Sequence, residues 1–241
     1  HEFRHHFESE VRALEKWVPG LTSGAWWSTP EIVTNSEELG AVILTELSGE
    51  IIEDSTPGPA ELIAAYKNAG RLARLLHNLK IDLSNEPRNQ LYSLDGVARY
   101  IEMSHQHLDA STCDWAEAIL TRADAWDGLS AVPMHGDYSP RNWILKCGDP
   151  TFKLIDWERS RPGYWVEDIQ RMTYDHWLDA PHFGDAFFEG YGRTPTEAEW
   201  RQANQITLIN AVAGGGWAIS HGDDQFADLN RRTVERLKEI L

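Results

Sequence analysis

The triplet His-Gly-Asp occurs twice in this sequence, at residues 135–137 and 221–223. Five residues after the first copy's aspartate stands Asn142, whereas Asp228 holds that place after the second copy and a helical, charged segment follows. Asparagine and aspartate oxygens suit a hard cation, and an aspartate beside them can meet a reacting hydroxyl. The first copy is therefore the candidate catalytic loop, and the second is expected to be a turn at a helix end.

The residues after the first copy predict a β-hairpin. Two short apolar runs, at 143–145 and 152–155, flank a turn-rich connector around Asp149. The expected register pairs Trp143 with Ile155, Ile144 with Leu154, and Leu145 with Lys153. Asn142 then faces Asp156 at the open end, and cross-strand neighbours lie about 5 Å apart. Together with phosphate oxygens and water, these two side chains could hold Mg²⁺, with Asp137 close by on the preceding loop.

Two other interpretations of this stretch remain open. Asparagine and aspartate are common turn residues at strand ends, so the pattern could be purely structural. Alternatively, His135 and Asp137 could be the ligands of a metal-dependent hydrolase. That second interpretation leaves Asn142 and Asp156 without a role.

Composition limits the possible partners. The 241 residues carry a formal net charge of −16, which argues against nucleic acid or an anionic membrane surface and favours a cationic small molecule. The two cysteines, Cys113 and Cys147, suggest neither a disulfide framework nor a metal site. No apolar run is long enough for a membrane span and no signal peptide is visible, so a cytoplasmic location is expected.

Hydrophobic periodicity predicts an α+β protein whose strands come mostly before its helices. The first helix carries Phe7, Leu14 and Trp17 on one face, and the apolar run 41–47 is typical of a buried strand. Residues 48–59 have the composition of a linker. Further expected elements are a strand at 31–34 and helices from Pro59, at 94–108, at 113–126, from the capping box at Thr196 towards Val212, and from 228 to the end.

The segments "HGDYSPRN" and "LIDWE" resemble the signature of the aminoglycoside phosphotransferase and choline kinase family, relatives of the protein kinases. The resemblance implies a protein kinase-like two-lobe architecture. Residues 1–47 would be the remnant of a small nucleotide-binding lobe with its hinge strand. Residues 48–241 would be the larger, mostly helical lobe that contains the catalytic hairpin.

The resemblance also implies roles for individual residues. Asp137 would orient the substrate hydroxyl or accept its proton, and Asn142 and Asp156 would hold Mg²⁺ on the phosphates of ATP or GTP. Asp168 would hold the backbone of the catalytic loop. The backbone of Glu46, Leu47 and Ser48 would meet the nucleotide base.

One departure from the family concerns the first helix. Glu10 is a better counterpart than Glu8 of the glutamate that pairs with a strand lysine, because Glu10 shares a face with the apolar residues. Neither that lysine nor the glycine-rich loop over the phosphates is found upstream, and Lys16 lies downstream in the same helix. The chain is therefore expected to lack its first strands; the alternative is a non-catalytic pseudokinase.

The family phosphorylates hydroxyl groups of small molecules. With the acidic composition, this favours a cationic acceptor such as an aminoglycoside or another antibiotic, with Glu158, Asp175 and Asp179 as candidate substrate-binding residues. The alternative acceptors are amino alcohols and sugar metabolites of the choline, homoserine or fructosamine type. Oligomeric state does not follow from the sequence.

Overall fold

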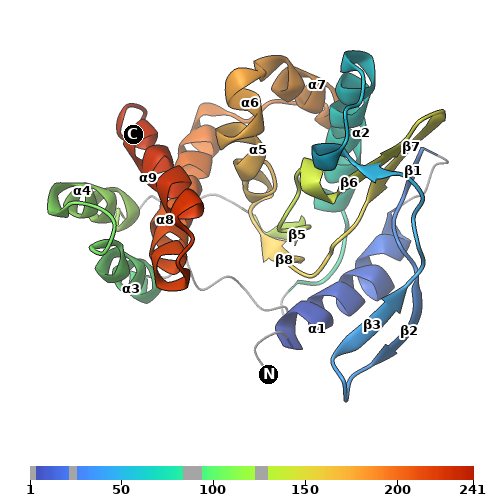
Figure 1. Ribbon diagram of the computed structural model, residues 1–241, viewed down its shortest axis with the longest axis horizontal. Coiled ribbons are helices and arrows are strands. Elements are labelled where there is room, and N and C mark those ends of the chain that lie inside the picture. Colours follow the sequence, from blue (N-terminus) through green and yellow to red (C-terminus); the bar gives the residue numbers. More distant parts are fainter. Residues whose placement is uncertain (1–3, 22–25, 84–93, 123–129) are drawn as a thin grey trace. The chain divides into compact units, whose positions relative to one another are not determined.

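The computed structural model describes residues 4–21, 26–83, 94–122 and 130–241 (Figure 1). It is an α+β structure, as predicted. The chain divides into two compact units, the first formed by residues 1–88 and 131–194 and the second by residues 89–130 and 195–241. The lobe boundary between residues 47 and 48, which the family resemblance implies, stays a prediction.

The first unit holds all the described strands and the candidate catalytic loop. Its helical elements are α1 (Arg4–Arg12), η1 (Ala13–Trp17), η2 (Val18–Gly20), η3 (Ile52–Asp54), α2 (Pro59–His77), η5 (Pro140–Asn142), η6 (Trp165–Glu167), α5 (Gln170–Tyr174), α6 (His176–Asp179) and α7 (Pro181–Tyr191). Its strands are β1 (Trp27–Ser28), β2 (Ile32–Ser36), β3 (Ala41–Leu44), β4 (Glu50–Ile51), β5 (Val132–Met134), β6 (Trp143–Lys146), β7 (Asp149–Leu154) and β8 (Arg161–Gly163).

The first helix forms as expected and orients one acidic residue inward. Leu14 and Trp17 are buried on the predicted apolar face, and Glu10 is only 8% exposed. The α-helical hydrogen bonding of α1 changes to a π-helical turn in η1, and the helix ends in the short turn at Pro19 and Gly20. Burial of this face therefore brings a carboxylate into the protein interior.

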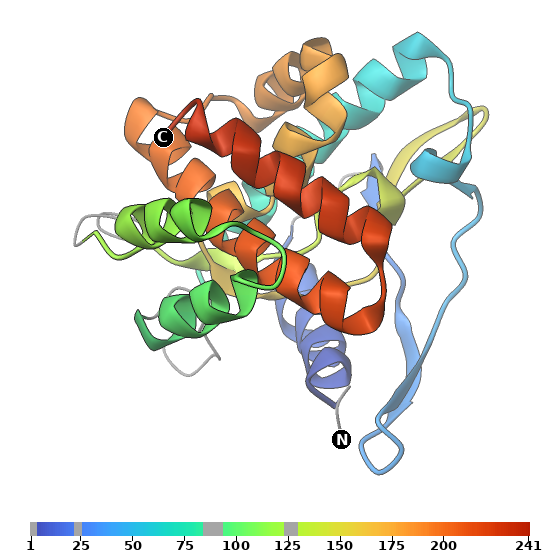
Figure 2. The same cartoon turned by 60° about the vertical axis from the view of Figure 1, so that its left-hand side comes forward.

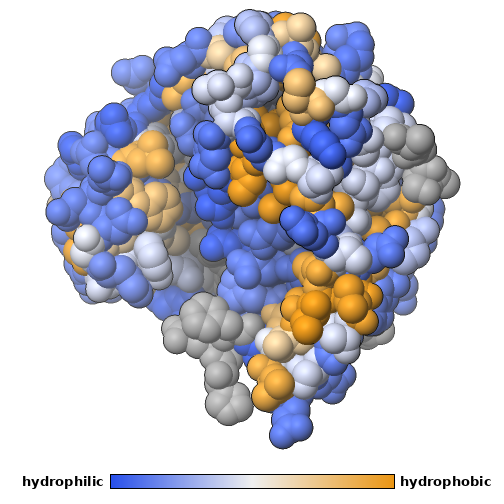
Figure 3. All heavy atoms as spheres, turned by 45° about the vertical axis from the view of Figure 1, so that its right-hand side comes forward, coloured by the Kyte–Doolittle hydropathy of each residue, from blue (hydrophilic) through white to orange (hydrophobic). Residues whose placement is uncertain are grey.

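The second early strand is not buried, and that expectation was wrong. β3 pairs only with β2 in a two-stranded sheet, and its residues alternate between exposed and half-buried. Val33 and Ile43 are 62% and 60% exposed, and Figure 3 shows apolar side chains gathered at the lower edge of this face. Helix α1 contacts part of β3, but it leaves the residues of the two-stranded ribbon exposed or half-buried, so an apolar run does not ensure burial.

The predicted catalytic hairpin is present as β6 and β7, inside a four-stranded sheet of order β1-β7-β6-β4. Its register differs by one residue from the expected one. The observed pairs are Trp143 with Leu154, Ile144 with Lys153 and Lys146 with Asp149, with an irregularity between Ile144 and Lys146. Between the last two pairs β6 has one residue and β7 has three, so β7 carries two extra residues there, and the register at the open end differs from that next to the connector.

The segment 48–59 is not a free linker. Glu50 and Ile51 form β4, which pairs antiparallel with β6, and Ile52 is buried at 5% exposure. This pairing supplies hydrogen bonds to the edge of β6 and ties η3 to the end of the catalytic hairpin. Helix α2 then starts at Pro59 as predicted and packs along α7.

The second unit is helical in the described residues. It consists of α3 (Leu94–Ser104), α4 (Ala110–Leu120), α8 (Glu197–His221) and α9 (Asp224–Lys238). The capping box at Thr196 forms as predicted, but α8 runs nine residues beyond Val212. Figure 2 shows α8 and α9 lying against each other with α3 and α4 beside them. None of the helices in the described ranges is long and apolar enough to span a membrane.

Candidate active site

The loop between β5 and β6 contains the first His-Gly-Asp, and Asp168 anchors its backbone. Asp168 accepts hydrogen bonds from the backbone N–H of His135 at 3.0 Å and of Gly136 at 2.7 Å. Its side chain is fully buried. The structure thus gives Asp168 the loop-holding geometry that the family resemblance implies.

A buried network holds Asp168 itself in place. Nε2 of His77 lies 3.0 Å from Asp168 Oδ2, and Nδ1 of the same ring lies 3.0 Å from the hydroxyl of Tyr191. Burial alone would raise the pKa of Asp168, but the hydrogen bond and charge of His77 lower it below the ordinary value. The aspartate is therefore kept ionised, and its hydrogen bonds to the loop are charge-assisted.

The second His-Gly-Asp is a helix-end turn, as expected. His221 ends α8, Gly222 has a left-handed backbone with φ of 72°, and Asp223 caps α9 by accepting a hydrogen bond from the N–H of Phe226 at 3.0 Å. This aspartate is occupied in capping, which is a structural role.

The glycines of the two His-Gly-Asp copies, Gly136 and Gly222, allow a controlled test of how tightly the first loop is packed. Both have positive φ, 81° at Gly136 and 72° at Gly222, and a left-handed backbone costs about 1–2 kcal/mol for other residues. A Cβ at Gly136 would lie 2.2 Å from the carbonyl oxygen of Arg159, whereas one at Gly222 meets nothing within 4 Å. We expect Gly136→Ala to lower the free energy of unfolding by about 1–3 kcal/mol more than Gly222→Ala. Urea unfolding of both variants measures this, and equal losses would contradict the packing argument.

The candidate catalytic side chain lies beside an arginine. The side chain of Asp137 is 7% exposed, and the guanidinium of Arg141 forms an ion pair with its Oδ2. Burial would lower the pKa of Arg141, but the hydrogen bond and charge of Asp137, assisted by Asp156 and Glu53, raise it. Arg141 therefore carries a fixed positive charge at the proposed reaction centre.

Asn142 is oriented so that its oxygen is available. Its Nδ2 donates to the backbone carbonyl of Asp137 at 2.8 Å, and the residue is 4% exposed. Because the amide nitrogen faces the loop, Oδ1 faces the other way and accepts no hydrogen bond from the described residues. This is the orientation that a cation ligand requires.

The backbone conformation that brings the Asp156 side chain near the catalytic loop was not predicted from the sequence. The N–H of Ile155 donates to the carbonyl of Asn142 at 3.0 Å, so Asn142 faces Ile155 and not Asp156, contrary to the expected register. A slip of one residue turns a side chain to the opposite face of a strand. At Asp156, however, φ is 65°, and this left-handed backbone changes the direction of the side chain. Its charge acts on both Arg141 and Glu10, which places the carboxylate near the catalytic loop.

The donor set fits a magnesium ion. Asn142 offers an amide oxygen and Asp156 a carboxylate, and neither oxygen set has a hydrogen-bond donor among the described residues. Mg²⁺ prefers such hard oxygen ligands and usually keeps water and substrate phosphates in its remaining positions. The described residues contain no group of three or more His, Cys, Asp or Glu that could hold a metal ion, so the other ligands would be phosphate and water. His135 does not fit as a ligand, because it is fully buried with Nε2 2.9 Å from the carbonyl of Ile155.

Glu10 lies behind the same hairpin end without a cationic partner. Its carboxylate accepts a hydrogen bond from the N–H of Trp157 at 3.4 Å. Burial is the main cause that raises its pKa from 4.5 to about 7, and the charges of Asp156 and Glu158 add to this. In the described part of the chain, no lysine or arginine forms an ion pair with it.

This environment predicts a pH-dependent stability. The folded-state pKa of Glu10 is raised, so the folded state binds the proton more tightly and loses stability as pH rises from about 4.5 through 7. Glu10→Gln cannot ionise, so we expect it to raise the free energy of unfolding at pH 8 by on the order of 1–3 kcal/mol, with no gain at pH 4.5. Thermal unfolding at both pH values in EDTA measures the difference. Glu8→Gln, at an exposed position of the same helix, is the control, and identical pH profiles for Glu10→Gln and the unmodified protein would contradict the assignment.

The predicted hinge is largely exposed, and Ser48 joins it to the hairpin through hydrogen bonds from Lys153 and Lys146. The side chains of Glu46 and Ser48 are exposed and that of Leu47 is half-buried, and the carbonyl oxygen of Ser48 accepts a hydrogen bond from Lys153 Nζ at 2.8 Å. Among the described residues, nothing accepts a hydrogen bond from the three backbone amides. They are therefore available to a ligand.

The three predicted substrate residues are not all brought together. Asp175 and Glu53 lie on either side of His176, whose Nε2 is 4.0 Å from Asp175 and 3.9 Å from Glu53. Glu158 instead lies 3.2 Å from His6 Nδ1, and Asp179 is exposed with no contact to the other two among the described residues.

Glu53 is the acidic residue that sequence reasoning missed. Its charge acts on Arg141, and after burial the charges of Asp175 and Glu53 also raise the pKa of Tyr66. No sequence pattern marks Glu53, because it lies in the segment interpreted as a linker. Its position comes from the pairing of β4 with β6.

Comparison with known proteins identifies the class. The model of the phosphotransferase enzyme family matches residues 11–203, and the chain belongs to that family. A search of curated proteins gives no match.

Solved structures with the same fold include phosphotransferases of several kinds. The GDP and kanamycin complex of APH(2")-IIia is 15% identical, with a TM-score of 0.72 over 98% of this chain and 83% of that one. Macrolide 2'-phosphotransferase MphH from Brachybacterium faecium is 17% identical, with a TM-score of 0.64 over 96% and 79%. A choline/ethanolamine kinase family protein from Mesorhizobium loti is 17% identical, with a TM-score of 0.69 over 97% and 78%. At these identities the likeness concerns the fold, and the acceptor must be argued from the site.

Proposed function

We propose that this protein transfers the γ-phosphoryl group of a nucleoside triphosphate to a hydroxyl of a cationic small molecule. The observation that carries the proposal is the grouping of Asp137, Asn142 and Asp156 at one end of the β6–β7 hairpin, on a loop whose backbone Asp168 holds. Phosphoryl transfer depends on positioning and charge neutralisation more than on covalent chemistry, and this arrangement suits both.

The nucleotide would bind between the hinge backbone and the hairpin end. The amides at Glu46, Leu47 and Ser48 are the candidates for the base. Asn142 and Asp156 would hold Mg²⁺ on the phosphates, where the bound ion neutralises oxygen charge. ATP and GTP both fit this description.

Asp137 would position the acceptor hydroxyl and accept its proton as the phosphoryl group transfers. Arg141 forms an ion pair with Asp137, and its charge also lies where the γ-phosphate would approach. A strong base is not required, because in a loose transition state the hydroxyl proton leaves late.

Acidic side chains near the site favour an amine-bearing acceptor. Glu53 and Asp175 lie close together, the field of Glu53 reaches Arg141, and Glu158 lies near Glu10. Such carboxylates attract cations, and a chain of net charge −16 adds to that field. We therefore favour an aminoglycoside or another cationic antibiotic; an amino alcohol is the alternative, and Asp179 is the weakest of the substrate candidates.

The test is to incubate the purified protein with Mg-ATP or Mg-GTP and panels of aminoglycosides, macrolides and amino alcohols. Mass spectrometry should reveal a phosphorylated acceptor in one panel, and Glu53→Gln should raise KM for that acceptor with little change in kcat. Nucleotide hydrolysis without any phosphorylated acceptor across all panels would count against the proposal.

A non-catalytic nucleotide-binding role is the second candidate, because no lysine or arginine of the described residues pairs with Glu10. Such a protein would bind Mg-nucleotide without turnover. Calorimetric titration with a non-hydrolysable nucleotide distinguishes the two, because binding with no product in any panel supports the non-catalytic role.

A further inference from the structure

Lys153 is a buried lysine that the proposed mechanism does not use. It lies on β7 opposite Ile144 and is only 5% exposed. Its ammonium donates to the carbonyl oxygen of Ser48 at 2.8 Å and to Oδ2 of Asp149 at 2.9 Å. A buried charge is costly unless it is paired and hydrogen-bonded, and these two partners, both in the first unit, meet that need. The lysine therefore ties the predicted hinge to the catalytic hairpin.

The residue after Ser48 holds the hinge close to the same hairpin. Gly49 has a positive φ of 132°, which favours glycine. A Cβ at this position would lie 2.7 Å from Cγ2 of Ile144 and closer still to the carbonyl oxygen of Leu145. The place of the Ser48 carbonyl is thus set by this close backbone packing together with the Lys153 ammonium.

Lys153 limits what the hinge can offer to a nucleotide base. The carbonyl oxygens of Glu46 and Leu47 accept no hydrogen bond from the described residues. The carbonyl of Ser48 already accepts a charge-assisted bond, and a base N–H that approached it would have to share the oxygen with the ammonium. Among the described residues, the hinge therefore has its three amide donors free but lacks one free carbonyl acceptor.

This pattern suits adenine better than guanine. The Watson–Crick edge of adenine has one donor, the N6 amine, next to one acceptor, N1. That of guanine has the acceptor O6 and two neighbouring donors, N1–H and the N2 amine. Two neighbouring donors need two acceptors close together, and a donor left unpaired in a binding site is costly.

We propose that Lys153 is a positioning residue that makes the hinge selective for adenine, because it occupies the Ser48 carbonyl that guanine would need for its second donor. This inference rests on the proposed function, since it takes the base to meet the backbone of residues 46–48. It goes further in naming the base, because the hinge amides by themselves fit ATP and GTP equally.

Isothermal titration with Mg-ADP, Mg-GDP and Mg-IDP tests the selectivity without turnover. Hypoxanthine, the base of IDP, keeps O6 and N1–H of guanine but lacks the N2 amine, so it has one donor fewer. We expect ADP to bind about tenfold or more tightly than GDP, with IDP between them. Equal Kd values for ADP and GDP, or tighter binding of GDP, would refute the adenine selectivity and leave the proposed phosphotransferase function in place. No binding of any of the three would overturn the nucleotide site itself.

Lys153→Met keeps the length of the side chain and removes the ammonium. In the folded variant, judged by circular dichroism, the ratio of Kd for GDP to Kd for ADP should fall about fivefold or more, because the Ser48 carbonyl becomes free. A merely structural lysine would weaken the three nucleotides alike, so an unchanged ratio would refute the proposal. Lys67→Met makes the same change at an exposed lysine of α2 that pairs with Glu189, and it should alter neither the ratio nor the affinities. The titrations of the unmodified protein do not depend on the folding of either variant.

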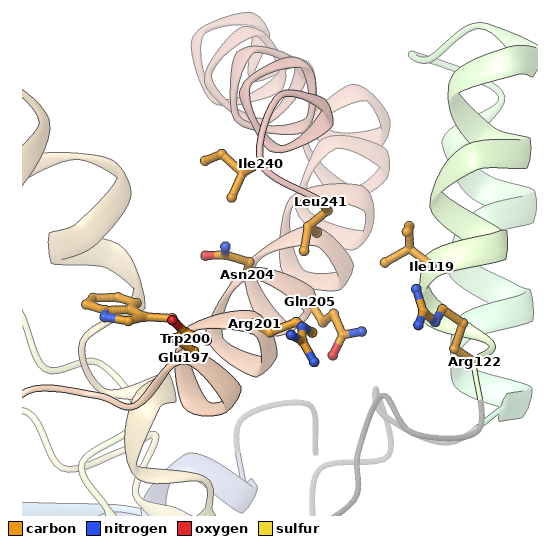
Figure 4. Close-up of a pocket in the computed structure, with 9 residues that line it drawn as sticks. All are labelled: Ile119, Arg122, Glu197, Trp200, Arg201, Asn204, Gln205, Ile240 and Leu241. Atoms are coloured by element: carbon orange, nitrogen blue, oxygen red, sulfur yellow. The ribbon is translucent and has the colours of Figure 1, made fainter.

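A cavity of the second unit offers a nucleotide a different place to bind (Figure 4). Its volume is about 310 Å³, and its lining includes Arg201 and Gln205 but no residue of the hinge or the hairpin. Arg201→Met should therefore leave all three Kd values unchanged. A loss of ADP affinity in this variant would place the nucleotide in the cavity and refute the role of Lys153.

Discussion

Asp137→Asn is expected to lower kcat for phosphoryl transfer by about 10²–10⁴-fold, the usual range for loss of a positioned general base. The amide cannot accept the hydroxyl proton and no longer attracts Arg141 as an ion pair. Because Asn142 binds the backbone carbonyl of residue 137 and not its side chain, the loop should keep its conformation. Initial rates measured with the acceptor found in the panels test this, and Kd for the nucleotide should change by less than threefold.

The second His-Gly-Asp supplies the control for this variant. Asp223→Asn makes the same chemical change at the same motif, but there the aspartate caps α9. We expect kcat of Asp223→Asn to equal that of the unmodified protein, with only a small loss of stability, since asparagine is also a good N-cap. Comparable loss of kcat in both variants would mean that the effect is structural and not chemical.

Asp156→Asn is expected to lower kcat strongly, as Asp137→Asn does, but not to destabilise the fold. Replacing the anionic carboxylate with a neutral amide weakens Mg²⁺ binding at this position, so kcat should fall at least 100-fold, and higher Mg²⁺ concentration should restore part of it. Asparagine tolerates the left-handed backbone at this position, and loss of the charge removes repulsion of Glu10. The thermal midpoint of the metal-free protein should therefore stay the same or rise.

A fall in kcat together with an unchanged or higher thermal midpoint distinguishes a functional aspartate from a structural one. Asp149→Asn in the same hairpin is the contrast, because Asp149 accepts hydrogen bonds from the N–H of Thr151 and from Lys153 Nζ. That variant should lose some stability and keep its activity. A fall in the thermal midpoint of Asp156→Asn without a change in Mg²⁺ dependence would remove Asp156 from the proposed metal site.

The candidate catalytic residues could be proposed from the sequence because their types and spacing are local. An aspartate, an asparagine five residues later and a hairpin that returns an aspartate lie within 20 residues of chain, so turn chemistry predicts that they lie close together. The same local reasoning separated the two His-Gly-Asp copies, since only the first precedes two apolar runs.

Predictions failed where the outcome depended on distant packing. The apolar run 41–47 was expected to be buried, but burial depends on a layer that covers the strand, and β3 pairs only with β2 in the described residues while α1 contacts just part of it. The segment 48–59 was interpreted as a linker, because nothing in its own composition indicates that β6 offers it an open edge. Glu53 was missed for the same reason.

The sequence by itself determined the class of enzyme, the hairpin and most of the helices, and it singled out the candidate catalytic loop, because these follow from local motifs and hydrophobic periodicity. Only the tertiary structure decided the hairpin register, the left-handed backbone at Asp156, the burial of Glu10 and the cavity beside Gln205. Each of these features depends on how distant parts of the chain pack together. A register shift of one residue, or one more packed layer, would change them although the local sequence pattern stayed the same.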